Sequence, residues 1–132
     1  MLGKEYGLYP EDSAQAWAVE SFLEHYRDLA ARLYQVMTEK DEERKKELGK
    51  EVLTNIIPAW LSVHEKRLEQ NGQDDHFVGD KTTIYDIKML AVIKTVFLNE
   101  KVPHHEEFQA IFKNYPRLNT FYETAIKQFA DF

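Results

Sequence analysis

The longest apolar stretch of the chain runs from Ile87 to Phe97 and is interrupted mainly by two lysines and a threonine. A helix with apolar side chains on nearly every side has to be enclosed by other elements. The pattern therefore predicts a buried helix that ends near Asn99 and stands at the centre of the domain.

The start of this helix carries a strong local signal. Gly79 and Asp80 mark a turn, and Thr83 and Asp86 follow with the Thr-x-x-acid spacing of a capping box. In such a box the threonine hydroxyl accepts the backbone N–H three residues on, while the carboxylate accepts the N–H of the threonine. Aspartate is a shorter variant of the usual glutamate or glutamine. We therefore predict that Thr83 and Asp86 together begin the central helix near Ile84.

A long amphipathic helix is predicted earlier in the chain, from a cap at Asp12 or Ser13 to about Thr38. Its apolar positions step by three and four residues, which is the signature of one buried stripe. They are Phe22, Tyr26, Leu29, Leu33 and Val36 or Met37.

A second long helix follows and is predicted to end at Asn71-Gly72. Its beginning, residues 39–50, is dense in glutamate and lysine three or four apart, which is typical of a solvated helix face. The apolar pattern continues to Leu68 with Pro58 inside it. Because proline lacks an N–H and crowds the carbonyl four residues back, we expect a kink there.

Two shorter helices complete the chain. One begins at Pro103, the sequence Asn114-Tyr115-Pro116 ends it, and the last helix places Leu118, Phe121 or Tyr122, Ala125 and Phe129 on one side. No segment alternates apolar and polar residues as a strand would. The predicted fold class is all-α: a bundle of about five helices around a buried central helix.

Composition narrows the classes of function. A chain of 132 residues suits one domain with a genuine core. The net charge of −6 and the scattered basic residues argue against a nucleic-acid partner. The lack of cysteine excludes disulfides, thiolate catalysis and cysteine zinc sites. With no apolar run of membrane length and no secretion signal, we expect a cytoplasmic protein and no membrane partner.

A search for catalytic constellations returns little. The sequence holds no glycine-rich phosphate loop, no nucleophile elbow and no zinc-binding pair of histidines four residues apart. The run from Asp74 to His76 could not converge on one ion without further ligands, so we expect no metal. His104 and His105 suit a surface or helix cap, and His25 and His64 suit packing or solvent.

Several segments together resemble a known family. The start, Leu2-Gly3-Lys4-Glu5-Tyr6-Gly7-Leu8-Tyr9-Pro10, is followed by a long helix with Arg27-Asp28-Leu29 and a proline-containing second helix. Then come Phe77-Val78-Gly79-Asp80 with the capping box, and later Asn114-Tyr115-Pro116-Arg117-Leu118. The whole resembles the C-terminal helical domain of a cytosolic glutathione S-transferase, nearest the mu, sigma and alpha-like branch.

The resemblance implies a domain that works with another. In these transferases a thioredoxin-like N-terminal domain binds glutathione and supplies the residue that activates its thiol. Residues 1–10 then represent a residual helix end and connector, and residues 11–132 the helical domain. The expected partners are the missing N-terminal domain and a second copy in a homodimer. The co-substrate is glutathione, and the role is detoxification of hydrophobic electrophiles.

The resemblance also assigns site residues, all of them on the first long helix. Asp28 matches the aspartate that reaches across the dimer to the γ-glutamyl amino group of glutathione, a charge-assisted contact. The alternative for Asp28 is a surface acid paired with Arg32. Arg27, Ala31, Gln35 and Thr38 match the electrophile pocket, with a plain solvent face as their alternative. Arg27 also stands where the prostaglandin D synthase relatives carry a metal-gathering acid, which argues against a metal here.

Other positions are assigned to folding or depart from the family. We predict that the capping box of Thr83 and Asp86 is structural and that no residue of this chain is catalytic. Lys88 stands where some relatives place a pocket aromatic. The chain alone is therefore expected to be inactive. Two alternatives remain: a non-catalytic interaction module, as in translation-factor and synthetase complexes, and a storage-type derivative that keeps only the fold.

Overall fold

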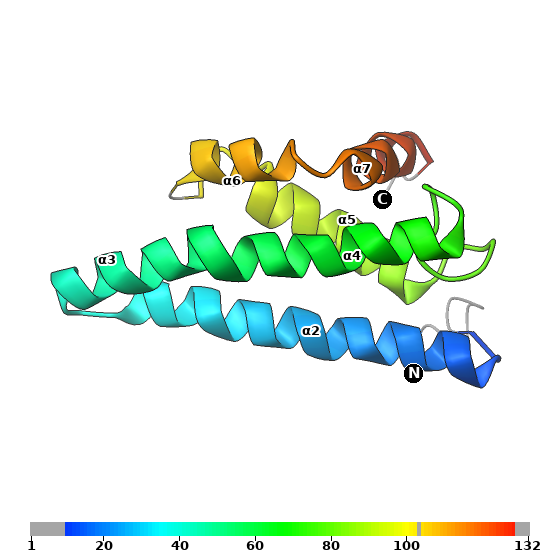
Figure 1. Ribbon diagram of the computed structural model, residues 1–132, viewed down its shortest axis with the longest axis horizontal. Helices are drawn as coiled ribbons and strands as arrows, with labels where there is room; N and C mark the ends of the chain where they lie inside the picture. Colours follow the sequence, from blue (N-terminus) through cyan, green and yellow to red (C-terminus); the bar gives the residue numbers. More distant parts are fainter. Residues whose placement is uncertain (1–9, 103, 129–132) are drawn as a thin grey trace.

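The computed structural model describes residues 10–102 and 104–128, and within them the protein consists of helices and connecting loops, without a strand (Figure 1). The elements form five helical rods. They are α2 (Ser13–Thr38), then α3 (Glu42–Glu51) continued by η1 (Val52–Ile56) and α4 (Ile57–Asn71), then α5 (Ile84–Val92) continued by η2 (Ile93–Phe97), then α6 (His105–Phe112), and α7 (Pro116–Gln128). The predicted all-α bundle of about five helices is confirmed.

The first two rods form a long antiparallel hairpin whose ends are fixed by aspartates (Figure 1). Asp12 caps α2 by accepting the N–H of Gln15 at 3.0 Å, and Asp41 caps α3 by accepting the N–H of Glu43 at 3.0 Å. A carboxylate at this position satisfies backbone donors that have no partner within the helix. Of the two predicted caps of α2, Asp12 is the one that forms.

Directly before Pro58, where a kink was predicted, the structure has a π-helical turn. Residues Val52–Ile56 make this turn, and the N–H of Ile57 donates to the carbonyl of Val52, five residues back. Pro58 follows directly, so the hydrogen-bond register of the rod changes just before the residue that has no N–H to donate. Single π turns are among the recognised places where helices kink. The rod is nevertheless continuous from α3 to α4 (Figure 1).

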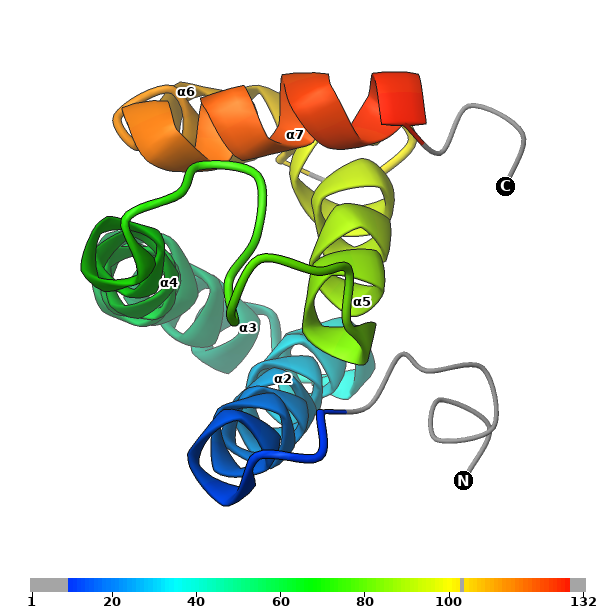
Figure 2. The same cartoon turned by 90° about the vertical axis from the view of Figure 1, so that its right-hand side faces the viewer.

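The rod of α5 and η2 is buried on the side that faces the bundle, as predicted, while Lys88, Ala91, Lys94 and Thr95 leave its other side exposed. In an end-on view α2, α4 and α5 surround a common core, and α7 lies across the open side (Figure 2). Tyr85, Met89, Ile93 and Phe97 of the central rod have no exposed surface. A second π turn, η2, ends this rod at Leu98, close to the predicted end at Asn99.

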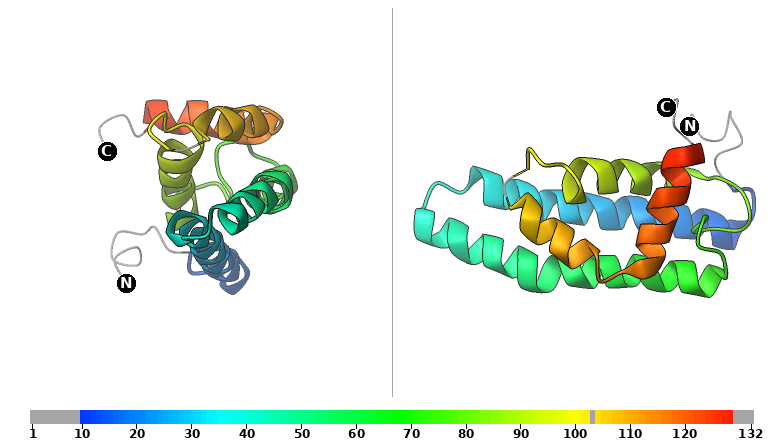
Figure 3. Two further views of the ribbon diagram at one scale, coloured as in Figure 1. Left: turned by 90° about the vertical axis from the view of Figure 1, so that its left-hand side faces the viewer. Right: turned by 90° about the horizontal axis from the view of Figure 1, so that it is seen from above.

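The last two helices close the bundle, with α6 running obliquely along it and α7 turning across α4 and α5 (Figure 3). The start of α7 is capped from another helix. Glu65 of α4 accepts the N–H of Leu118 at 2.8 Å and that of Arg117 at 3.2 Å. Tyr115 fixes the preceding turn by donating its hydroxyl to the carbonyl of Pro58 at 2.9 Å. The predicted break at Asn114–Pro116 is thus held by contacts with α4.

Two sets of predictions fall outside the described residues: the helix end and connector in residues 1–9, and the roles of Pro103 and Phe129. Among the helices that are described, none has the length and apolar character that a membrane crossing requires.

Candidate functional site

The residues predicted for substrate contact lie together on one side of α2. Asp28, Ala31, Gln35 and Thr38 are separated by three, four and three residues, and all four are exposed. This spacing places them in one stripe along the helix surface. Arg27, also exposed, adjoins the stripe. The structure therefore offers these side chains to a partner or ligand, and their roles stay predictions.

Asp28 stands at the start of this stripe without the ion pair considered for it. Within the described part of the chain, Asp28 and Arg32 form no salt bridge. The charge of Asp28 acts instead on His25, one turn earlier. Burial and the charge of Arg67 lower the pKa of His25, and Asp28 partly opposes them. The Asp28 carboxylate is thus exposed beside a histidine that the fold keeps neutral.

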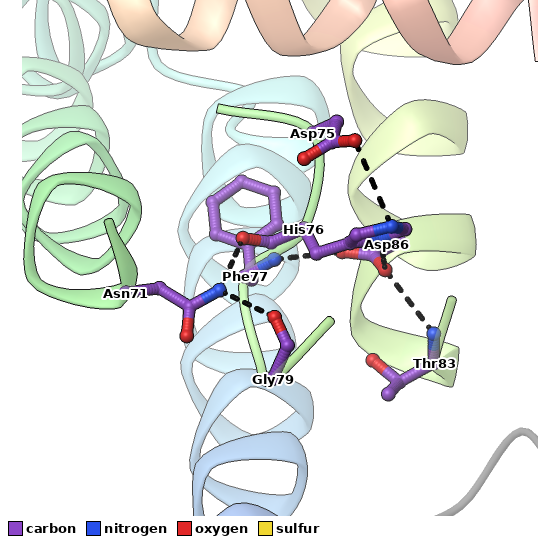
Figure 4. Close-up of polar contacts among 7 residues, drawn as sticks. All are labelled: Asn71, Asp75, His76, Phe77, Gly79, Thr83 and Asp86. Carbon is purple, nitrogen blue, oxygen red and sulfur yellow. Dashed lines mark hydrogen bonds and ion pairs between the residues drawn. The ribbon is translucent and has the colours of Figure 1, made fainter. Parts of the chain in front are cut away.

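The capping box forms the centre of a buried polar cluster, the Asp86 cluster, made of Asn71, Asp75, His76, Phe77, Gly79, Thr83 and Asp86 (Figure 4). The Asp86 carboxylate accepts the N–H of Phe77 at 2.9 Å and that of Thr83 at 3.1 Å, and it contacts His76 Nδ1 at 3.1 Å. Asn71 donates to the carbonyls of His76 and Gly79 at 2.8 and 2.9 Å. One carboxylate therefore ties the loop after α4 to the first turn of α5.

The two halves of the capping box differ in hydrogen bonding. Asp86 bonds the Thr83 N–H, and the Thr83 hydroxyl faces the Asp86 N–H as a capping box requires. That hydroxyl oxygen is buried, yet it has no hydrogen-bond partner within the described residues. The carboxylate of Asp86 therefore provides most of the cap. Burial raises the pKa of Asp86, and the bonds from Phe77, His76 and Thr83 oppose that rise.

The acidic run at residues 74–76 does not assemble a site. Asp74 pairs with Arg117 at 2.8 Å, Asp75 lies 3.8 Å from His76 Nε2, and His76 turns inward to Asp86. No group of three or more potential metal ligands comes together among the residues that the structure describes.

A second buried polar group, the histidine–tyrosine network, was not predicted from the sequence. It joins Ser21 and His25 of α2, His64 and Arg67 of α4, and Tyr85 of α5. His25 Nδ1 lies 3.0 Å from His64 Nε2, and His64 Nδ1 is hydrogen-bonded to the Tyr85 hydroxyl. Arg67 donates to Tyr85 at 3.1 Å and to Ser21 at 2.9 Å. The network thus links the three helices that surround the core.

The geometry of this network suits neutral histidines and a neutral tyrosine beside the charged Arg67. Tyr85 can accept from Arg67 and donate to His64 Nδ1, and His64 can then donate from Nε2 to His25. Burial, His25 and Arg67 together hold the pKa of His64 well below its usual value, and burial raises the pKa of Tyr85. The Tyr85 ring is stacked on Phe22 and on Phe77, each 4.4 Å away between ring centres. The network therefore buries hydrogen-bonded groups between α2, α4 and α5, and the charge of Arg67 only partly opposes the effect of burial on Tyr85.

Sequence reasoning assigned His64 to packing or solvent, and the structure buries it completely within the network. A signal was available in the apolar neighbours of His64 on α4. The partners lie 21 residues away at Tyr85 and 39 away at His25. No local pattern links positions so far apart.

Comparison with known proteins supports the predicted family. The sequence profile of the family described as "Glutathione S-transferase, C-terminal domain" matches residues 27–128. The chain belongs to this family. The resemblance seen in the sequence is confirmed.

Curated relatives come from the same family. The "Glutathione S-transferase class-mu 28 kDa isozyme" of Schistosoma bovis is 27% identical over 124 residues, which cover 89% of this chain and 58% of the relative. The isozyme of the same name from Schistosoma mansoni is 26% identical over the same shares of the two chains. This chain therefore spans a little over half the length of the curated relatives it matches.

A solved structure shows the same fold. The "prostaglandin synthase D of Nilaparvata lugens" superimposes with a TM-score of 0.77 at 17% sequence identity, over 96% of this chain and 58% of that one. At this identity the likeness carries the fold alone.

Proposed function

We propose that the chain is the electrophile-pocket and dimerisation half of a glutathione S-transferase. The proposal rests on one observation above all: the family profile covers residues 27–128, and the residues matched to the site form an exposed stripe on α2. In the complete protein a thioredoxin-like domain would cover this side of the helix and bind glutathione. The protein would act in the cytoplasm on hydrophobic electrophiles.

The reaction of the complete protein is a nucleophilic attack. The glutathione thiolate forms a bond to an electrophilic carbon, and in a substitution the leaving group departs with the bonding electron pair. In our proposal this chain performs no step on the thiol. Asp28 binds the γ-glutamyl ammonium group of the glutathione held by the partner subunit, and Ala31, Gln35 and Thr38 line the space for the electrophile.

Asp28→Asn in the protein that carries both halves tests this proposal. Since a hydrogen bond to a charged group contributes about 1.5–3 kcal/mol, the KM for glutathione should rise about tenfold or more. The KM for the electrophile should change little. Glu47→Gln, an exposed acid on α3, is the matched control and should leave both values unchanged. An unaltered KM for glutathione in Asp28→Asn would refute the role of Asp28.

A second assay addresses the division of labour between the halves. Chlorodinitrobenzene and glutathione mixed with this chain alone should react only at the uncatalysed rate. Clear turnover would show that a residue of this chain activates the thiol and would overturn the proposal.

The alternative, a non-catalytic interaction module, has some support from exposed apolar side chains on α2. Trp17, Tyr34 and Met37 are 66%, 68% and 72% exposed. Tyr34 and Met37 lie one turn apart, so their side chains add apolar surface to the same part of α2. The transferase proposal also uses this helix in a homodimer, so size-exclusion chromatography does not separate the two functions by itself. Glutathione-dependent turnover of the complete protein does separate them.

A further inference from the structure

An apolar cavity lies at the end of the bundle where α2 meets α3, and the proposed function makes no use of it. Its volume is about 260 Å³. Val52 and Phe108, which are almost completely buried, form the floor, and the largely exposed Met37 and His104 stand at the rim. The cavity is therefore partly open and reaches into the core.

The cavity is separate from the stripe predicted to contact substrates. From α2 it is lined by Leu33 and Val36, which pack against the core, and by the exposed Met37 at the rim. The residues assigned to glutathione or the electrophile do not line it; they are Arg27, Asp28, Ala31, Gln35 and Thr38. A ligand here would occupy the interior of this domain and would need no contact with glutathione.

Three irregularities of the backbone meet at this cavity. Both π turns contribute to its wall, η1 through Val52 and η2 through Val96. His104, at the rim, has a φ of +63°, and it is the one non-glycine residue with positive φ among those described. Isolated π turns and strained backbone are found often at functional sites. Their convergence on one space distinguishes this cavity from an ordinary packing defect.

The chemistry of the wall defines the ligand. Apart from Thr95 and His104 the lining side chains are apolar, the Thr95 hydroxyl donates to the carbonyl of Ala91 at 2.7 Å, and His104 pairs with Glu107 at 2.7 Å. An ion entering such a space would lose its hydration without compensation. Since an apolar cavity of about 150 Å³ is enough to bind benzene, this one has room for a larger ring system. We propose that the cavity binds a small uncharged apolar molecule of one or two rings.

Indole is a suitable probe, and methyl NMR of this chain in the absence of glutathione is the measurement. Indole should produce saturable shifts of the methyl signals of Val36, Val52 and Val96. Indole-3-carboxylate, which differs by a negative charge, should produce none. Glutathione and the N-terminal domain are absent from this measurement. A lack of indole binding would therefore not affect the proposed transferase function, and a lack of transferase activity would not affect the indole site.

Gly49→Leu provides the decisive variant. A Cβ at Gly49 would meet only Val36 Cγ1, at 3.9 Å, so a leucine there can extend into the cavity. The indole affinity should fall at least about tenfold. Gly49→Ala controls for the gain in helix propensity, and Ala110→Leu, exposed on α6, controls for added apolar surface. Both controls should still bind indole.

A second filling variant, Val96→Phe, approaches the cavity from η2 and keeps the test valid should Gly49→Leu fail to fold. Saturable shifts in the parent chain that both filling variants abolish would establish the site. Three results would each overturn the proposal: no saturable shift in the parent chain, unchanged affinity in a folded filling variant, or equal shifts at exposed methyls such as those of Val63 and Ile126.

Discussion

The two buried polar groups of this domain are built in opposite ways. The Asp86 cluster is local, since every member lies within residues 71–86 and a single carboxylate organises it. The histidine–tyrosine network is long-range, since it joins Ser21 and His25 to His64, Arg67 and Tyr85 on three helices. The first fixes where the central helix begins. The second fixes how α2, α4 and α5 sit against one another.

The difference also concerns charge. Asp86 receives two backbone N–H groups and a histidine, whereas the network surrounds neutral histidines with aromatic rings and one arginine. The Asp86 cluster can be disrupted by removing the Asp86 carboxylate, which accepts its hydrogen bonds. The histidine–tyrosine network can be disrupted by removing the Tyr85 hydroxyl or by protonating His25 or His64.

The largest effect is expected from Asp86→Ala. The capping box alone suggests a loss of roughly 1–2 kcal/mol, but the structure adds the N–H of Phe77 and the ring of His76 to the groups left unpaired. Since each unsatisfied buried group costs about 1–3 kcal/mol, we expect the free energy of unfolding to fall by about 3 kcal/mol or more. Chemical denaturation measures it.

Thr83→Val sharpens the same prediction. Because the Thr83 hydroxyl bonds no partner within the described residues, its isosteric replacement should cost less than about 1 kcal/mol. Equal losses in Thr83→Val and Asp86→Ala would contradict the unequal division of the box. Asp86→Ala should not change ligand affinity in folded protein, since Asp86 is a structural residue.

A smaller effect is expected from Tyr85→Phe in the long-range network. Removing the hydroxyl leaves His64 Nδ1 without its partner and Arg67 with one bond fewer, at a cost of about 2 kcal/mol in unfolding free energy. Tyr122→Phe is the matched control, because the half-buried Tyr122 has no hydroxyl bond among the described contacts. A loss no greater than that of the control would show that the network contributes nothing to stability.

The long-range network also predicts a dependence of stability on pH. His25 and His64 have a pKa below 6.5 in the folded protein, and unfolding returns both pKa values toward 6.5. Below that pH the unfolded chain therefore binds more protons, so stability falls as the pH falls. The slope should approach about 1.4 kcal/mol per pH unit for each histidine that stays neutral when folded.

Denaturant midpoints measured between pH 7 and 5.5 test this dependence. His64→Gln should have a shallower slope than the parent chain, whatever its stability at pH 7. His105→Gln, in which a half-buried histidine of α6 is removed, should keep the parent slope. Identical slopes in the parent chain and His64→Gln would contradict the assignment.

Much of the fold could be predicted because its signals are local. The caps at Asp12 and Thr83–Asp86, the stop at Gly72 and the apolar run to Phe97 all act within a few residues of the features they produce. Gly72 ends α4 in the left-handed conformation that glycine adopts without strain. The candidate site is partly of this kind, since helical spacing alone places Asp28, Ala31, Gln35 and Thr38 on one side of α2.

The rest could not be read from local patterns. His64 resembles any isolated helical histidine, and only the approach of α2 and α5 gives it two partners. Glu65 shows no sign in the sequence that it caps α7 from 53 residues away. Pro58 predicted a kink. A π turn is one of several ways in which a helix accommodates a proline, and packing selects among them.

Local patterns were enough to predict the helices and the family, because most caps and apolar stripes are decided by near neighbours. The tertiary structure alone decided which polar side chains are buried together and where the space between π turns remains open. Those properties depend on distances between helices, and no spacing along the chain encodes them.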